Sequence, residues 1–518
     1  MRNSSFFNRD PDNRNFLWIF LFFYFVFSFL TYRDYGITCD ENDWYISGAD
    51  MLKHYLHLGK EDGIKIFSIE QASHNYLYPA VLRIFSHSIN PERLHLLNLL
   101  FASIGFAAAF ELLLAAYRNP FKALAGPMAL FLTLRFSGDI PANPKDMPFA
   151  VLYLLSLASI YLFRSRWKEP TWEALVVGSL IGLTTCVRAI GLTLLPLWGF
   201  YRFWQYRLEE KRPGLGSWIS REWPNFLMVF VVSQFWMMAC WPYLGENYFG
   251  NYLSIFKSSQ RYTWEGAIMF MGQAVMSTQL PWIYLPVWLL VTLPVFLILF
   301  FLFAWFKLPK MEKTAMELFV LLGSAFFLQI LLYLILRPVI YNGLRHYLFL
   351  VPIFCVMGSM GLLEFFKGGW KSPWKKAAAS LCALNLLSIL FQLASLYPFQ
   401  YIYFNEFVGG LRGAAGKFET DYWGASLKEA AQWLSANGAP DPNRVYRVKT
   451  CSTREQQTHY FKPNLVGDNA MKDPDYQIEP NNPVMLERDH VSAGQIKSQA
   501  IFTVEREGVP LYYVLKLK

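Results

Sequence analysis

The sequence has few charged residues and carries none of the short motifs that mark common soluble enzymes. Of its 518 residues, 16% are charged, whereas a soluble protein of this length carries about 25%. This composition excludes a disulfide-rich secreted module, and the six cysteines form no CxxC pair and no metal-ligand spacing. No Walker loop, GxGxxG after a strand, HExxH or GxSxG occurs, so nucleotide, metalloprotease and serine-hydrolase sites lack support.

Long apolar runs dominate instead, because 54% of the residues are apolar and 18% are aromatic. A membrane span needs about 20 apolar residues, and we expect about eleven spans in an all-α polytopic membrane protein. One helix over 174–201 would place Arg188 near mid-membrane and export the basic segment 202–223, so we favour two helices with Arg188 at their outer turn. The expected spans are 16–32, 94–117, 121–136, 147–163, 174–187, 189–201, 224–242, 282–306, 316–336, 346–366 and 377–397.

The net charge of +9 is assigned to membrane topology and not to nucleic-acid binding, because basic clusters lie in alternate loops. The other loops then share the outer face: 33–93, 135–146, the turn at 188, 243–281, 337–345 and everything after 398. No A-x-A-like cleavage site follows the first span, so we interpret it as an uncleaved anchor. Cys39 and Cys451 lie outside the spans and could pair.

The composition becomes ordinary and polar from residue 399. We therefore predict a transmembrane domain over 1–398 and a small extracytoplasmic α/β domain over 399–518. The latter would contain an amphipathic helix over 426–435, a strand over 444–449, and a hairpin whose strands cover 501–505 and 511–515.

The first outer loop holds three acids within four residues: Asp40, Glu41 and Asp43. The bland interpretation is a solvated loop in which Asp43 caps the next helix. The functional interpretation is a carboxylate held at the membrane surface as a general base, which must be ionised and within reach of a proton.

Other outer loops add polar residues on the same face. Asp139, Lys145 and Asp146 lie in the second loop, where Pro and Asn could also form a purely structural turn. Arg345 and His346 precede the tenth span, and the planar guanidinium of Arg suits a phosphate. His74 alone is more often a structural hydrogen-bonding residue than a catalyst. This mixture suits a phosphate-bearing lipid substrate attacked by an activated hydroxyl.

Six short pieces, in order along most of the chain, together resemble the bacterial GT-C membrane glycosyltransferases related to protein O-mannosyltransferases and to the aminoarabinose transferase of lipid A. The pieces are Asp40-Glu41, residues 143–149, Arg188 with Gly191, residues 341–346, residues 403–410, and residues 419–424. The resemblance implies transfer of a sugar from a polyprenyl-phosphate carrier to a glycan, lipid or protein acceptor outside the cytoplasm, in a bacterial inner membrane.

The resemblance assigns the base to Asp40, with Glu41 as an orienting residue or an acceptor contact. The chain departs from the family pattern at Asp139, where relatives often carry His, and at His74-Asn75. The residue that binds the donor phosphate is therefore left open, and the candidates are Lys145, His74, and Arg345 with His346. Substrate contacts are expected from Asp139, Asp146, Arg188, Tyr341 and Asn342.

The expected reaction is a single displacement with inversion, because a polyprenyl phosphate leaves as a stabilised anion and needs no protonating acid. A divalent metal on Asp40, Asp43 and Asp139 is conceivable, but no ligand spacing supports it, and no cofactor is expected. Two other classes stay open: a flippase or transporter of polyprenyl-linked sugars, and a non-catalytic membrane assembly subunit. A flippase predicts charges inside spans and symmetry between halves, and neither is evident.

Overall fold

The computed structural model describes residues 11–57, 75–86, 90–164, 172–209, 214–260, 264–369, 372–450, 459–481 and 493–518, together with Thr453 and Gln456. Two residues singled out from the sequence, His74 and Cys451, lie outside the described residues. The expected His74 phosphate contact and the Cys39–Cys451 pairing therefore stay predictions.

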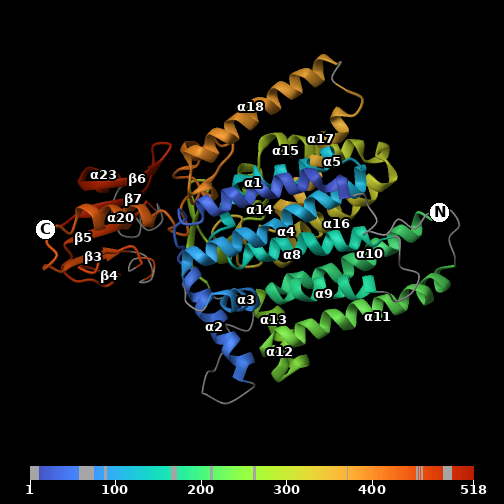
Figure 1. The fold of residues 1–518 in the computed structure, drawn as a ribbon, viewed down its shortest axis with the longest axis horizontal. Coiled ribbons are helices and arrows are strands. Elements are labelled where there is room, and N and C mark those ends of the chain that lie inside the picture. The colour runs from blue at the N-terminus through green and yellow to red at the C-terminus, as the bar shows by residue number, and fades with distance from the viewer. Residues whose placement is uncertain are drawn as a thin grey trace.

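The described chain is mainly helical, and its long helices run side by side in one body (Figure 1). Helix α18 stands away from this body along one edge, and the C-terminal sheet lies at one end (Figure 1). The principal helices are α1 (Asn15–Thr31), α2 (Glu41–His57), α3 (Leu77–Phe85), α4 (Pro91–Tyr117), α8 (Asp146–Leu162), α9 (Trp172–Val187), α10 (Leu194–Arg207), α11 (Leu215–Cys240), α13 (Tyr248–Gln260), α16 (Lys313–Leu336), α17 (Leu350–Phe366) and α18 (Pro373–Ser395).

Among the described residues, four helices are long and apolar enough to cross a membrane, or five if one bent pair is a single span. The four are α4, α11, α16 and α18. Four shorter apolar helices, α1, α8, α9 and α17, also coincide with expected spans. The protein is therefore an integral membrane protein, although the expected number of eleven spans is not confirmed.

Two expected spans are interrupted. Residues 121–136 form no single helix but fall into α5 (Pro120–Ala123), α6 (Ala125–Phe131) and α7 (Leu134–Asp139), since Pro127 has no N–H and the backbone of Thr133 is not helical. Residues 282–306 form α14 (Tyr284–Thr292) and α15 (Val295–Lys307), whose axes are bent by 116°. Pro294 explains this bend, because it disfavours helical geometry at the preceding Leu293.

The expected break at Arg188 is present. Helix α9 ends at Val187, Arg188 is extended, and the chain continues through the short 3-10 helix η3 (Ala189–Thr193) into α10. Gly191 lies against Thr185, where a Cβ would come within 2.8 Å of the backbone nitrogen. The absence of a side chain at Gly191 therefore allows the chain to double back on α9.

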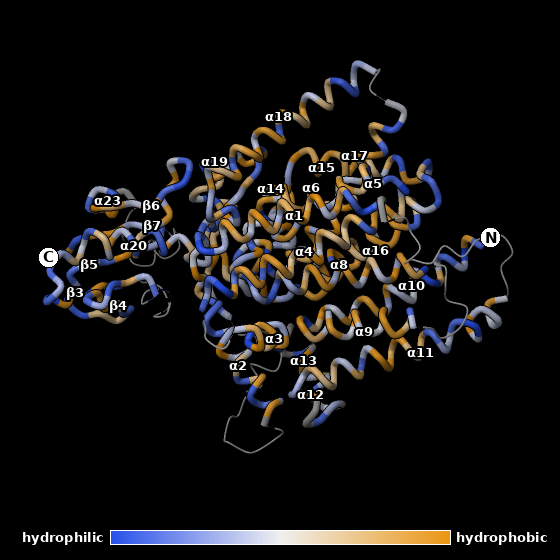
Figure 2. The backbone as a smooth tube through the Cα atoms, viewed as in Figure 1, coloured by the Kyte–Doolittle hydropathy of each residue, from blue (hydrophilic) through white to orange (hydrophobic). Residues whose placement is uncertain are grey.

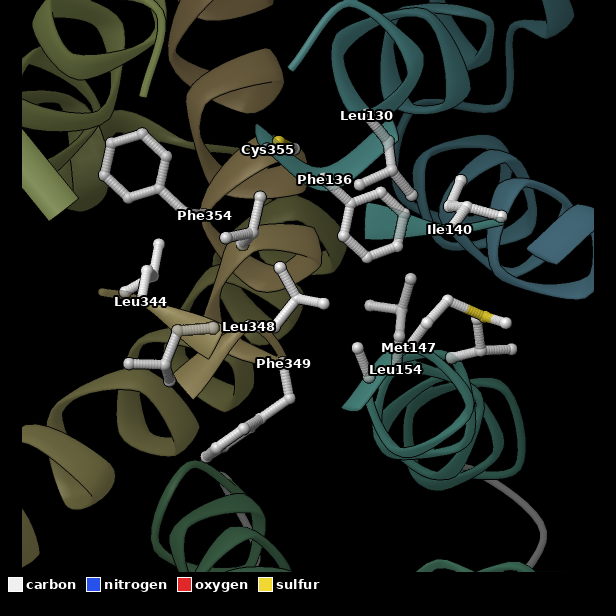
Figure 3. Close-up of a cluster of buried hydrophobic side chains, with 14 of the residues drawn as sticks. Leu130, Phe136, Ile140, Met147, Leu154, Leu344, Leu348, Phe349, Phe354 and Cys355 are labelled. Atoms are coloured by element: carbon white, nitrogen blue, oxygen red, sulfur yellow. The ribbon is translucent and has the colours of Figure 1, made fainter. Parts of the chain in front are cut away.

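Apolar side chains fill the helical body, and its helices are the most hydrophobic part of the chain (Figure 2). Part of this core lies directly beneath the loops that carry the predicted site residues. Figure 3 shows Phe136, Ile140 and Met147 facing Leu344 and Leu348 across it. Packing here brings the loop between α7 and α8 next to the segment that precedes α17.

The C-terminal region contains a five-stranded sheet in the order β4-β3-β5-β7-β6, next to α20 (Leu427–Asn437). The strands β3, β4 and β5 are parallel, whereas β7 pairs antiparallel with β5 and β6. The predicted helix, first strand and hairpin are all confirmed, and Glu507 and Gly508, both with positive φ, form the hairpin turn. The strands are β3 (Tyr446–Thr450), β4 (Leu465–Asp468), β5 (Tyr476–Pro480), β6 (Ala500–Arg506) and β7 (Val509–Lys516).

A second, two-stranded sheet was not expected from the sequence. It consists of β1 (Ala267–Phe270) and β2 (Gln273–Met276), which pair antiparallel. Phe270 lies at its end and contacts Phe418 edge to face. The small sheet thus contacts the segment that leads into Glu419.

Candidate active site

Four segments far apart in the sequence meet at one end of the helical body. They are the loop before α2, the loop between α7 and α8, the segment before α17, and residues 419–426. The backbone N–H of Cys39 donates to the carbonyl of Trp423 at 3.0 Å, which joins the first segment to the last. Gly138 lies against the backbone of Tyr401. A side chain at position 138 would prevent α7 from packing this closely on the segment around Tyr401.

Asp40 and Arg345 form an ion pair at the centre of these segments. An Arg345 guanidinium nitrogen donates to Asp40 Oδ2 at 2.7 Å, although 305 residues separate the two. The side chain of Arg345 is 4% exposed and that of Asp40 is 31% exposed. Burial would raise the pKa of Asp40, but the charge and hydrogen bond of Arg345 outweigh it, so the pKa is lowered and Asp40 is ionised.

Aromatic rings hold the Arg345 guanidinium on two sides. It lies 4.8 Å from the ring centre of Tyr341 and 5.4 Å from that of Trp423. Tyr341 in turn stacks on Trp264 at 4.2 Å and contacts His346 edge to face at 4.6 Å. Such cation–π contacts fix the position of a cation without neutralising its charge. Arg345 is thus oriented but still able to attract an anion.

Lys145 is a second buried cation near Asp40. Its ammonium lies 5.8 Å from the Trp44 ring centre, and its side chain is almost fully buried. Burial, and then the charges of Arg188 and Arg345, lower the pKa of Lys145 well below its usual value. An anion placed among these three cations would favour the charged form of Lys145.

Arg188 and Asp146 are brought together as an ion pair between the start of η3 and the start of α8. The turn before α8 is built by Asn143, whose Oδ1 accepts a hydrogen bond from the backbone N–H of Asp146 at 2.8 Å. Asp146 is thereby held at the helix N-terminus, where a negative charge is favourable. The pair places the Arg188 charge close enough to affect Lys145.

Glu41 is engaged in structure around the start of α2. Its Oε1 accepts hydrogen bonds from the backbone N–H of Thr38 at 2.8 Å and from its hydroxyl at 3.1 Å. Its Oε2 lies 2.9 Å from His95 Nε2, and the side chain is 1% exposed. These bonds tie Glu41 to the turn that precedes α2. Asp43 lies inside α2, which begins at Glu41, and so does not cap the helix as expected.

The sequence reasoning missed Arg135, which lies within an expected span, and gave no role to Glu419 and Tyr422. Arg135 is fully buried, donates to the carbonyl of Tyr401, and lies 5.1 Å from the Tyr422 ring centre. An arginine inside an apolar run was the signal that could have identified it.

Two buried acids, Asp139 and Glu419, lie near Arg135. Tyr422 donates to Asp139 Oδ1 at 3.4 Å. Burial raises the pKa of Asp139 to about 7 and that of Glu419 to about 8, despite the opposing charges of Arg135 and Arg345. Both acids are therefore held partly protonated near neutral pH.

The turn before Arg345 requires unusual backbone geometry. Asn342 and Gly343 both have positive φ, and a Cβ on Gly343 would come within 2.7 Å of an Arg135 nitrogen. The N–H of Gly343 donates to the Tyr284 hydroxyl at 3.1 Å. The turn is thereby fixed against both Arg135 and α14. Within the described residues, no group of three or more His, Cys, Asp or Glu side chains could hold a metal ion.

Comparison with solved structures identifies the architecture. The crystal structure of ArnT from Cupriavidus metallidurans bound to undecaprenyl phosphate superposes with a TM-score of 0.53, at 11% sequence identity, over 97% of this chain and 98% of that one. This chain has the GT-C fold of ArnT. The relationship predicted from the six short pieces is thereby confirmed at the level of the fold.

The apo crystal structure of the same ArnT gives a TM-score of 0.49 at 12% identity, over 96% of each chain. No protein-family model matches the sequence, and no curated protein matches it. The chain thus shares the fold of ArnT at low sequence identity.

Proposed function

We propose that the protein is a membrane glycosyltransferase that moves a sugar from a polyprenyl-phosphate donor to a hydroxyl acceptor, with Asp40 as the base. One observation carries the proposal: an ionised, partly exposed Asp40 meets a buried Arg345 at 2.7 Å. The fold adds support, because the ArnT structure that shares it is bound to undecaprenyl phosphate. An acid that can accept a proton and a cation that can hold a phosphate are the two groups this reaction needs.

In the reaction, Asp40 removes the proton of the acceptor hydroxyl as its oxygen attacks the anomeric carbon. The new carbon–oxygen bond forms as the bond to the donor phosphate oxygen breaks, and the polyprenyl phosphate leaves with the electron pair. Inversion follows when the base and the leaving phosphate lie on opposite faces of the sugar. The sugar must then lie between Asp40 and the phosphate.

The Asp40–Arg345 ion pair, which is present without donor, therefore has to open when the donor binds. A donor phosphate would compete with Asp40 for Arg345, since both are anions and the guanidinium offers several donors. Once Arg345 pairs with phosphate, Asp40 loses the charge that lowers its pKa and becomes a stronger base. Donor binding thus activates the base.

The remaining residues have supporting roles in this proposal. The charge of the phosphate favours the protonated form of Lys145, which helps to neutralise the leaving group, with His346 as a further candidate. Arg188 and Asp146 position the Lys145 turn, and Glu41 fixes the start of α2. Sugar contacts are assigned to Asp139, Tyr341 and Asn342. We place the site and the C-terminal region on the extracytoplasmic face of a bacterial inner membrane.

The test is sugar transfer by the purified protein in lipid vesicles, with radiolabelled polyprenyl-phosphate sugars as donors and membrane extract as the acceptor pool. Asp40→Asn should lose about 10²–10⁴-fold in transfer rate. Asp50→Asn is the matched control, because Asp50 lies on α2, the helix that follows Asp40, pairs with exposed Lys53, and should be replaceable without loss. Equal transfer by wild type and Asp40→Asn would remove Asp40 from the mechanism. Movement of lipid-linked sugar across the bilayer without transfer would instead establish a flippase.

A further inference from the structure

The helices α9 and α11 pack against each other with their backbones in contact. Gly178 and Gly182 lie one turn apart on α9, and a Cβ on them would come within 2.9 Å of the Val229 carbonyl oxygen and 2.7 Å of the Ser233 carbonyl oxygen. The contacts advance toward the C-terminus on both helices, from Gly178 and Val229 to Gly182 and Ser233, so the helices are parallel. This small-xxx-small arrangement is the usual means of bringing two membrane helices into close contact.

The next position on the same face of α9, four residues after Gly182, is Cys186. Its Sγ donates to the carbonyl of Trp236 at 3.3 Å, and Cys240, one turn further along α11, packs against the buried cluster that contains Cys186. Cys240 is the last residue of α11, and Cys186 is one residue from the end of α9. Both are free thiols in the structure.

We propose that Cys186 and Cys240 are a disulfide site that links the ends of α9 and α11. A disulfide needs Cα atoms about 4.4–6.8 Å apart, and helices reach such proximity only where small residues let their backbones touch, as Gly178 and Gly182 do here. Both helix ends lie on the predicted outer face, where disulfides persist. The proposal does not depend on the glycosyltransferase activity.

The bond forms by exchange with an external small-molecule or protein disulfide. The Cys240 thiolate attacks one sulfur of that disulfide, which forms a mixed disulfide and releases one thiol. The Cys186 thiolate then attacks the Cys240 sulfur and releases the second thiol. The two cysteines lose two protons and two electrons in total, and the external disulfide is reduced to two thiols. Cys240 reacts first because it is partly exposed, whereas Cys186 is fully buried.

The link would fasten a region that connects to the candidate active site. Arg188, two residues after Cys186, forms the ion pair with Asp146. On the other side, Asn75 donates to the carbonyl of Cys240 at 2.8 Å, and the Tyr55 hydroxyl donates to that of Ala239 at 2.9 Å. A covalent bond here would hold the start of η3, and hence Arg188, against α11 and the first outer loop.

The experiment treats the purified full-length protein in detergent with oxidised glutathione. The protein is then denatured, its remaining thiols are alkylated with N-ethylmaleimide, and its peptides are mapped by mass spectrometry. The expected result is a cross-linked pair of peptides that contain Cys186 and Cys240 and that separate after reduction. Cys355 and Cys382, which are free and lie on other helices, should be fully alkylated and serve as internal controls.

A variant tests the order of the two steps. In Cys186→Ser, Cys240 should stop at the mixed disulfide with glutathione, since no second thiol can resolve it. The proposal is overturned if both cysteines of the wild type are fully alkylated after glutathione treatment. It is also overturned if Cys240 of the wild type retains glutathione, or if either cysteine links to a different partner.

Discussion

Replacement of Arg345 by Gln is the most informative perturbation of the ion pair. Two unit charges about 4 Å apart near a protein surface interact by roughly 4 kcal/mol, and the 31% exposure of Asp40 reduces this to about 2 kcal/mol. Arg345→Gln should therefore destabilise the fold by about 2 kcal/mol. Loss of one donor to the leaving phosphate should lower the rate by about 10²–10³-fold.

The pH profile distinguishes this role from a merely structural one. In the wild type, the charge of Arg345 keeps the pKa of Asp40 low, so kcat/KM should stay level down to acidic pH. Without Arg345, burial dominates and raises the pKa of Asp40, so the acid limb of kcat/KM should move to higher pH.

The assay is transfer of labelled sugar in vesicles between about pH 5 and 9, with Asp50→Asn as the control for the loss of an outer charge and with folding checked by thermal unfolding. An unchanged acid limb in a folded Arg345→Gln variant would show that Asp40 is not the titrating base. A rate within threefold of wild type would show that Arg345 does not hold the leaving phosphate.

Three further outcomes follow from the structure. Burial raises the pKa values of Asp139 and Glu419 to about 7 and about 8, so the folded state binds more protons than the unfolded chain. Stability should therefore fall as pH rises from about 4 to 8. Asp139→Asn should flatten this slope in thermal unfolding scans. Gly182→Val should destabilise by about 1–3 kcal/mol, because its side chain meets the α11 backbone. Gly216→Ala, on the exposed start of α11, has free space and should not destabilise in the same unfolding assay. Glu41→Gln should cost about 1–2 kcal/mol of unfolding free energy, because it weakens the hydrogen bonds from Thr38 to a buried carboxylate, yet it should retain more transfer activity than Asp40→Asn. An equal loss of activity in a fully stable Glu41→Gln protein would instead give Glu41 a chemical role.

Local sequence patterns predicted most elements. The apolar runs located α1, α4, α8, α16, α17 and α18 to within a few residues, because hydrophobic length and flanking polar residues are local properties. The polar turn between two alternating runs likewise predicted the hairpin of β6 and β7. The bend at Pro294 was visible as a proline but was interpreted as part of one helix.

The candidate site was only partly accessible from sequence. The motifs pointed to Asp40, Lys145 and Arg345, but nothing local joins residues 305 positions apart. Glu41 was grouped with Asp40 by adjacency, whereas the structure turns its carboxylate to Thr38 and His95.

The sequence by itself determined that the chain lies in a membrane, where six of its long apolar helices lie to within a few residues, and which loops carry charge. Only the tertiary structure decided that Arg345 pairs with Asp40, that Arg135 is buried near Asp139, and that Cys240 packs against the cluster of Cys186. Hydrophobicity and turn chemistry act over a few residues and leave a readable pattern. Contacts between helices depend on how side chains of distant segments fit together, and no single segment encodes that fit.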